Sequence, residues 1–153
     1  RRVLFRSDAG LVVQWHDGAH ADAVALVERA VRAERRSWKG REGSGLTEPG
    51  FARFYRDLAA GLGPGRLRAG FAVLDGDDVG YILGAVRDGR YRGLQLAYAV
   101  EVAPLSVGNL LQLGQMERLV AEGVTHYDLG QDIAYKERWS DELFVTGTEV
   151  FAA

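Results

Sequence analysis

Apolar and polar residues alternate along three consecutive runs in the middle of the chain, which is the period of a β-strand. The runs are residues 66–75, 79–87 and 91–102. An Asp-Gly-Asp-Asp turn separates the first two, and Asp-Gly at 88–89, a strong hairpin signal, separates the second from the third. The pattern predicts a three-stranded antiparallel meander, with Leu94, Leu96 and Tyr98 on one face of its third strand.

Helical spacing flanks the meander on both sides. Apolar residues recur every three or four positions in 17–38, in a helix capped by Thr47, and in 106–120. Strands are also expected at 11–15, 125–129 and 143–151, and a short helix at 133–141. Because the helix from Ser106 crosses from the meander to 125–129, that strand should pair in parallel. The pattern predicts an α+β domain with a mixed sheet and helices on both faces.

Composition narrows the classes of function. The 153 residues carry a net charge of −2 and no cysteine. Disulfides, thiolate metal sites and a cysteine nucleophile are therefore excluded, and the three histidines are not spaced as a metal site. No apolar run reaches the roughly 20 residues of a membrane-spanning helix, and no signal-peptide pattern is seen. We expect a cytoplasmic protein with no bound metal and no membrane partner.

The first seven residues are set apart from the fold. Val-Leu-Phe-Arg-Ser within 1–7 resembles a translated sequencing adapter, so we treat 1–7 as a non-native leader and 8–153 as the domain. We expect this domain to be the C-terminal lobe of a longer protein. Trp15, Trp38 and the strand at 11–13 would then form an apolar edge that the missing lobe covers. The isolated chain would fold, but would self-associate or stay poorly active.

The segment 102–109 is the first candidate site, because a strand ends there and a helix begins. Pro104 stops the strand, and Ser106 is expected to cap the helix. Gly108, in the first helical turn, would let a ligand approach the backbone. The free N–H groups and positive end of such a helix bind anions such as phosphate. An ordinary capped helix explains the same residues equally well.

Acidic and tyrosine side chains near this turn are the candidates for proton transfer. No P-loop and no nucleophile elbow is present, which favours direct transfer without a covalent enzyme intermediate. Glu101 precedes the turn, Asp128 ends a strand, and Tyr135 follows. A carboxylate can accept a proton from an amine, and a tyrosine can donate one to a leaving thiolate. Alternatively, Asp128 caps a turn at Gly130 and Tyr135 packs in the core.

Cationic and aromatic side chains complete the candidate site. Lys136 is suited to holding a phosphate or stabilising an oxyanion, and is otherwise a solvated lysine. The basic run 32–41 suits either an anionic ligand or the C-terminal end of a helix dipole. The candidate substrate-binding residues are Trp38, Lys39, Tyr55 and Tyr98.

The order of elements and several short motifs resemble a known family. The motifs are Arg-Ser-Trp-Lys-Gly at 36–40, Phe-Tyr at 54–55, Leu-Ser-Val-Gly-Asn-Leu-Leu at 105–111, Tyr-Asp-Leu-Gly at 127–130 and Tyr-Lys-Glu-Arg-Trp at 135–139. Together they resemble a branch of the GNAT-fold acyltransferases associated with cellulose and exopolysaccharide biosynthesis and related to the Fem-type aminoacyltransferases. The resemblance spans residues 19–151.

The resemblance implies acetyl-CoA or another acyl-CoA as cosubstrate, an amine acceptor, and direct attack through a tetrahedral intermediate. The usual Gln/Arg-x-x-Gly-x-Gly/Ala phosphate loop of the wider family is absent, and the segment 104–109 stands in its place. The cofactor-binding residues that it implies are Val102, Ser106, Val107, Gly108, Asn109 and Lys136.

The sequence thus predicts an N-acyltransferase that acts on an amine of a sugar, a cell-envelope precursor or a small metabolite. A Fem-like transferase that uses aminoacyl-tRNA is the first alternative, which the basic run favours and the negative net charge does not. A non-catalytic lobe that supports a partner domain is the second alternative.

Overall fold

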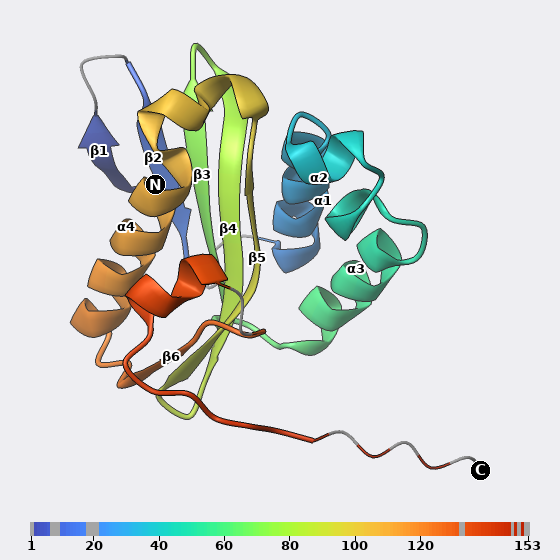
Figure 1. Ribbon diagram of the computed structural model, residues 1–153, viewed down its shortest axis with the longest axis vertical. Helices are drawn as coiled ribbons and strands as arrows, with labels where there is room; N and C mark the ends of the chain where they lie inside the picture. The colour runs from blue at the N-terminus through green and yellow to red at the C-terminus, as the bar shows by residue number, and fades with distance from the viewer. Residues whose placement is uncertain are drawn as a thin grey trace.

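A six-stranded sheet with the strand order β1-β2-β3-β4-β5-β6 forms the centre of the computed structural model (Figure 1). The structure describes residues 10–17, 22–131, 134–147, 149 and 151, and only the backbone of 2–6 and 135. The strands are β1 (Arg2–Arg6), β2 (Val12–His16), β3 (Leu67–Leu74), β4 (Asp77–Arg87), β5 (Arg90–Tyr98) and β6 (His126–Asp128). Neighbouring strands are antiparallel except β5 and β6, which are parallel. The predicted mixed sheet, meander and crossover are confirmed.

Helices cover both faces of the sheet, as predicted (Figure 1). The α-helices are α1 (Ala23–Glu34), α2 (Trp38–Arg41), α3 (Phe51–Gly61) and α4 (Val107–Ala121). The 3₁₀ helices are η1 (Gly45–Thr47), η2 (Val100–Leu105) and η3 (Ala134–Trp139). α1, α2 and α3 lie on one side of the sheet and α4 on the other. None of the helices in these described ranges is long and apolar enough to cross a bilayer.

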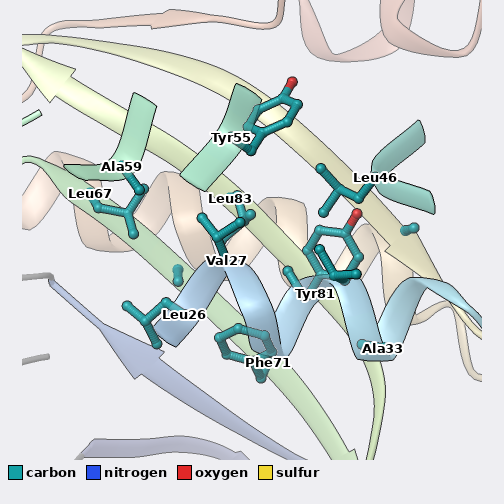
Figure 2. Close-up of a cluster of buried hydrophobic side chains, with 14 residues drawn as sticks. Leu26, Val27, Ala33, Leu46, Tyr55, Ala59, Leu67, Phe71, Tyr81 and Leu83 are labelled. Carbon is teal, nitrogen blue, oxygen red and sulfur yellow. The ribbon is translucent and has the colours of Figure 1, made fainter. Parts of the chain in front are cut away.

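The face below α1 and α3 holds the larger apolar cluster (Figure 2). Leu26 and Val27 of α1 pack there with Tyr55 of α3, and β3 and β4 contribute Phe71 and Tyr81. α1 begins after Asp22, whose side chain accepts hydrogen bonds from two N–H groups of the first turn, as an N-cap should. The cap and the apolar stripe together fix which side of α1 meets the sheet.

The face below α4 is packed around glycines. Trp15 of β2 is 5% exposed, and a Cβ atom added to Gly114 of α4 would lie 2.6 Å from its indole ring. A Cβ atom on Gly80 of β4 would lie 2.8 Å from Val107. Because real Cβ atoms do not approach other atoms this closely, only glycine allows α4 to lie so near the strands.

A β-bulge in β5 corrects the predicted faces of that strand. Leu83 pairs with Gln95 and Gly84 pairs with Gly93, so Leu94 is an extra residue on β5. Leu94 consequently packs against the α1–α3 cluster, whereas Leu96 and Tyr98 pack against the α4 cluster. The prediction that all three share one face was wrong, because strict alternation does not survive a one-residue insertion.

Several predicted element boundaries were also wrong. The helix expected at 17–38 ends at Glu34, because the chain turns to place Ser37 in a β-bridge with Ala99 and only then forms α2. Thr47 ends η1 and does not cap α3, which starts after Gly50, a residue in the left-handed region at φ 92°. The third strand of the meander ends at Tyr98 and does not extend to 102, and residues 100–105 form the 3₁₀ helix η2.

The two ends of the chain differ from the predictions as well. The excluded leader includes β1, which pairs antiparallel with β2. Leu11, Val13 and Trp15 are buried in the α4 cluster and do not form the uncovered apolar edge expected there, whereas Trp38 is 52% exposed. The described part of 143–151 contains no strand, and its large apolar side chains are exposed. The boundary proposed between leader and domain stays a prediction.

Candidate active site

An opening in the sheet beside β5 defines the candidate site. β6 pairs with β5 only from Arg90 to Arg92, and Asp128 is its last paired residue. At the other end of this β5 edge, Ser37 forms its bridge with Ala99. Between the two, the edge of Gly93–Tyr98 that faces away from β4 has no strand beside it among the described residues. Backbone N–H and C=O groups at such an edge are available to a ligand.

A cleft of about 760 Å³ occupies this opening. Its walls come from α2, β5, η2, the first turn of α4, the segment after β6, and η3. The predicted site residues that line it are Trp38, Lys39, Tyr98, Ser106, Gly108, Asn109 and Lys136. Residues that the sequence analysis did not single out, among them Arg92, Gln95 and Gln112, line it as well. Volumes of this order hold ligands of cofactor size.

The N-terminus of α4 supplies the anion-binding element. Leu110 donates its N–H to the carbonyl of Ser106 at 3.1 Å, so the N–H groups of Val107, Gly108 and Asn109 have no acceptor within the helix. Ser106 lies at the predicted cap position, but its backbone is left-handed at φ 53° and its side chain makes no capping hydrogen bond. The predicted side-chain cap was therefore wrong, while the three free N–H groups suit a phosphate.

The two valines predicted to bind cofactor lie in the core. Val102 is 4% exposed and Val107 is fully buried, both in the α4 cluster. Their side chains cannot touch a ligand in the cleft, and neither lines it. Only the backbone N–H of Val107 is placed to contribute, because it belongs to the first turn of α4.

Gly108 is required by packing within the protein. A Cβ atom there would lie 2.8 Å from the ring of Tyr98, which lines the same cleft. The sequence predicted only that Gly108 leaves room for a ligand, and did not predict this contact with Tyr98. Any side chain at 108 would first displace Tyr98, so a substitution there tests packing as well as binding.

Lys39 reaches the open edge of β5. Its Nζ donates to the backbone carbonyl of Leu96 and to Oε1 of Gln95, both at 3.1 Å. Nε2 of Gln95 in turn donates to the hydroxyl of Tyr55 at 3.1 Å. Tyr55 itself is 8% exposed and does not line the cleft. Burial lowers the pKa of Lys39, and the nearby carboxylate of Glu34 partly offsets that effect.

The carboxylate of Glu34 lies near Lys39 and interacts with its charge. This carboxylate is fully buried and accepts hydrogen bonds from the Tyr81 hydroxyl, at 2.8 Å, and from the Leu46 backbone N–H. Burial raises the pKa of Glu34, against the opposing effect of Tyr81 and Lys39. Glu34 is not among the predicted site residues. Its position, three residues after Val31 on the apolar stripe of α1, is the signal that indicates a buried carboxylate.

Glu101 lies outside the cleft lining. Its carboxylate pairs with Arg36 at 2.7 Å and with Arg41 at 3.8 Å, on the exposed surface of η2. A hydrogen bond from its own backbone and the guanidinium of Arg36 lower the pKa of this carboxyl. The pairing also divides the basic run 32–41, because Arg36 is neutralised by Glu101 and Asp77 while Lys39 turns into the cleft.

Asp128 joins β6 to β5 at the closed end of the opening. One oxygen accepts from the backbone N–H of Gly130 at 2.8 Å, and the other pairs with Arg92. Burial acts to raise the pKa of Asp128, but Arg92 and the Gly130 N–H outweigh it and the pKa is lowered. Asp128 is not part of the cleft lining, although its partner Arg92 is. The turn-capping alternative is thus present in the structure.

The segment after β6 closes the cleft from the opposite side. Nζ of Lys136 donates to the carbonyls of Leu129, at 2.7 Å, and Gln131, at 3.0 Å, which holds η3 against the end of β6. Trp139 of η3 lines the cleft, as does Trp38 of α2, which is 52% exposed. The side chain of Tyr135 lies outside the described part of the structure, so its catalytic role stays a prediction.

Comparison with known proteins identifies the family of this chain. Residues 1–138 match the family described as an acetyltransferase (GNAT) domain. No curated protein matched the chain. An aminoglycoside acetyltransferase from an uncultured soil metagenomic sample is similar in structure, with a TM-score of 0.62, 17% identity, and coverage of 94% of this chain and 99% of that one.

Two further solved structures share the fold. An aminoglycoside acetyltransferase from soil metagenomic DNA, solved in complex with sisomicin, gives a TM-score of 0.64 at 13% identity, covering 93% of this chain and 97% of that one. The ribosomal-protein-S18-alanine N-acetyltransferase of Escherichia coli gives 0.52 at 13% identity, with 73% and 62% covered. The chain therefore belongs to the GNAT acetyltransferases, enzymes that use acetyl-CoA as the acyl donor.

Proposed function

We propose that acetyl-CoA binds in the cleft beside β5 and that its pyrophosphate lies on the N-terminus of α4. The free N–H groups of Val107, Gly108 and Asn109 are the donors for the phosphates. The open edge of Gly93–Tyr98 offers backbone hydrogen bonds to the amide-containing arm of the cofactor, apart from the carbonyls of Leu94 and Leu96, which accept from Tyr55 and Lys39. The bound donor supplies an activated thioester carbonyl. Lys136 and Trp139 would close the cleft over it.

The acceptor amine is proposed to enter from the side of the sheet that carries α1–α3. Trp38 and Lys39 line the cleft there, and Tyr55 holds Gln95 in place beneath them. The motifs that resemble the exopolysaccharide branch support an amino sugar or another cell-envelope precursor as the acceptor. Because the family is one of enzymes, the non-catalytic alternative is not supported.

Tyr135 is proposed as the proton donor to the leaving thiolate. It lies on η3 between Ala134 and Lys136, and both Lys136 and Trp139 of the same short helix line the cleft. Glu101 and Asp128 remain proposals as proton acceptors. Each is already paired with an arginine and has a lowered pKa, which makes it a weaker base.

The observation that carries the proposal is the free N-terminal turn of α4 at the mouth of the opening in the sheet. Asn109→Asp tests it, because Asp is nearly the same size and stabilises a helix N-terminus. The added charge should repel the pyrophosphate and weaken CoA binding by about tenfold or more, measured by calorimetry. Asn109→Ser, which adds no charge, should bind CoA like the parent. Equal affinities of all three proteins would place the phosphates elsewhere.

A further inference from the structure

The charged side chains of the cleft all carry positive charge. Among the described residues that line it, these are Lys39, Arg92 and Lys136, and no carboxylate lines it. The nearest acidic groups are occupied. Glu34 is buried against Tyr81, and Asp128 is paired with Arg92. An acceptor with several ammonium groups would therefore meet repulsion and no compensating carboxylate.

The distribution of lysine shows that Lys39 is unusual in this chain. The 19 basic residues comprise 17 arginines and only two lysines, Lys39 and Lys136. Both lysines line the cleft, whereas Arg92 is the one arginine among the described residues that line it. A compact ammonium fits where a planar guanidinium does not. Lysine is therefore concentrated at the cleft in this chain.

Of the three cations, Lys39 is the one available to the acceptor. Arg92 is neutralised by Asp128, and Lys136 holds two carbonyls of the segment after β6. Lys39 has the buried carboxylate of Glu34 nearby, but it forms no ion pair within 4 Å among the described residues. Lys39 lies on α2, on the opposite side of the sheet from α4 (Figure 1). Phosphates bound at the N-terminus of α4 would therefore not need its charge.

The ammonium of Lys39 also has donor capacity to spare. It carries three N–H groups, and the contacts to Gln95 and Leu96 account for two of them. The exposed indole of Trp38 lies next to it on α2 and offers an apolar surface to a ring. A ring-bearing acceptor with an anionic substituent would satisfy both features.

We infer that the acceptor is an amine that also carries an anionic group, a phosphate or a carboxylate, and that Lys39 binds this group. The inference rests on the proposed function, because it places the acceptor in the same cleft. It would distinguish this chain from the structurally similar aminoglycoside acetyltransferase that was solved in complex with sisomicin.

Three amino sugars with the same amine test the inference. Glucosamine is neutral apart from that amine, glucosamine 6-phosphate adds a phosphate, and muramic acid adds a carboxylate. We expect one or both anionic sugars to exceed glucosamine about ten- to a hundred-fold in kcat/KM, the range of a charge-assisted hydrogen bond. Which of the two is preferred distinguishes phosphate from carboxylate. Calorimetry with the same sugars on the CoA-bound protein gives a second readout that does not depend on turnover.

Substitutions then assign the preference to Lys39. Lys39→Gln should raise KM for the anionic sugar more than for glucosamine, and so bring the ratio of their kcat/KM values close to one. Arg41→Gln is the matched control, because Arg41 is 61% exposed and does not line the cleft. It should leave the ratio unchanged.

The outcomes that overturn the inference differ from those that overturn the proposed function. Equal binding and turnover of the three sugars, or a preference for glucosamine or sisomicin, would refute an anionic acceptor. An unchanged ratio in Lys39→Gln would refute the role of Lys39. Failure of CoA to bind would instead refute the proposed donor site, while calorimetry with the same sugars on the protein without CoA would still decide the inference.

Discussion

The two faces of the sheet are built by different means. The face that carries α1 and α3 has a buried polar contact at its centre, in which Glu34 joins Tyr81 of β4 to the backbone of Leu46. The face that carries α4 depends on shape, with Trp15 lying against Gly114. The first face positions Lys39, and the second positions the N-terminus of α4.

Each of these two faces holds one wall of the cleft in place by a different physical effect. A buried hydrogen-bonded carboxylate fixes a loop because its donors have no other acceptor. A glycine contact fixes a helix because nothing larger fits between the surfaces. Loss of polar groups should therefore damage the α1–α3 face most, and gain of volume should damage the α4 face most.

The largest effect is expected for Glu34→Ala. Removal of the carboxylate leaves the Tyr81 hydroxyl and the Leu46 N–H buried without an acceptor, at about 1–3 kcal/mol each. The free energy of unfolding should fall by about 2–6 kcal/mol, measured by urea denaturation. Glu34→Gln keeps an acceptor for Leu46 and should lose less than half as much. Similar losses in the two variants would show that the carboxylate is not the anchor of this face.

The next effect is expected for Gly114→Ala on the α4 face. Alanine normally stabilises a helix relative to glycine, but here its Cβ would overlap Trp15. We expect a net loss of about 1–3 kcal/mol in thermal or urea unfolding. Gly61→Ala in α3 is the matched control, because no atom lies within 4 Å of the added Cβ. That control should be neutral or up to about 0.5 kcal/mol more stable.

The preference for an anionic acceptor should depend on pH, because it requires Lys39 to be charged. Burial lowers the pKa of Lys39 below its usual value of 10.5, and a lysine is charged only below its pKa. The preference for an anionic acceptor should hold at neutral pH and decline as the pH rises through this lowered value. The ratio of kcat/KM for glucosamine 6-phosphate and glucosamine, followed from neutral to alkaline pH, measures it. A ratio that stays constant up to pH 10.5 would argue against Lys39 as the charged group.

The smallest effect is expected for Asp128→Asn, because its ion pair with Arg92 is exposed, unlike the buried contact of Glu34. The side chains of Asp128 and Arg92 are 52% and 56% exposed, and exposed pairs contribute about 0–1 kcal/mol. Asparagine keeps an acceptor for the Gly130 N–H. We therefore expect stability within about 0.5 kcal/mol. We also expect kcat to change less than tenfold, because the carboxylate is held by Arg92. A loss of about 10²-fold or more in kcat with unchanged stability would instead identify Asp128 as a catalytic base.

Elements whose signals are local could be predicted from the amino-acid sequence. Alternation and the Asp-Gly turn gave the meander, and the spacing of apolar residues in 106–120 gave the crossover helix. The position of Ser106–Asn109 at a helix start followed from the same pattern. Each of these features depends on residues within a few positions of one another, so the chain shows them before it folds.

The residues that form the cleft come together through contacts between segments distant in the chain, so they could not be predicted in the same way. Lys39 and Leu96 are 57 positions apart, and the hydrogen bond between them exists because Ser37 bridges the end of β5. The bulge at Leu94 and the contact of Gly108 with Tyr98 likewise depend on neighbouring strands. Local patterns do not record such pairings, because the register of strands and the approach of a helix are set by packing between segments distant in the chain.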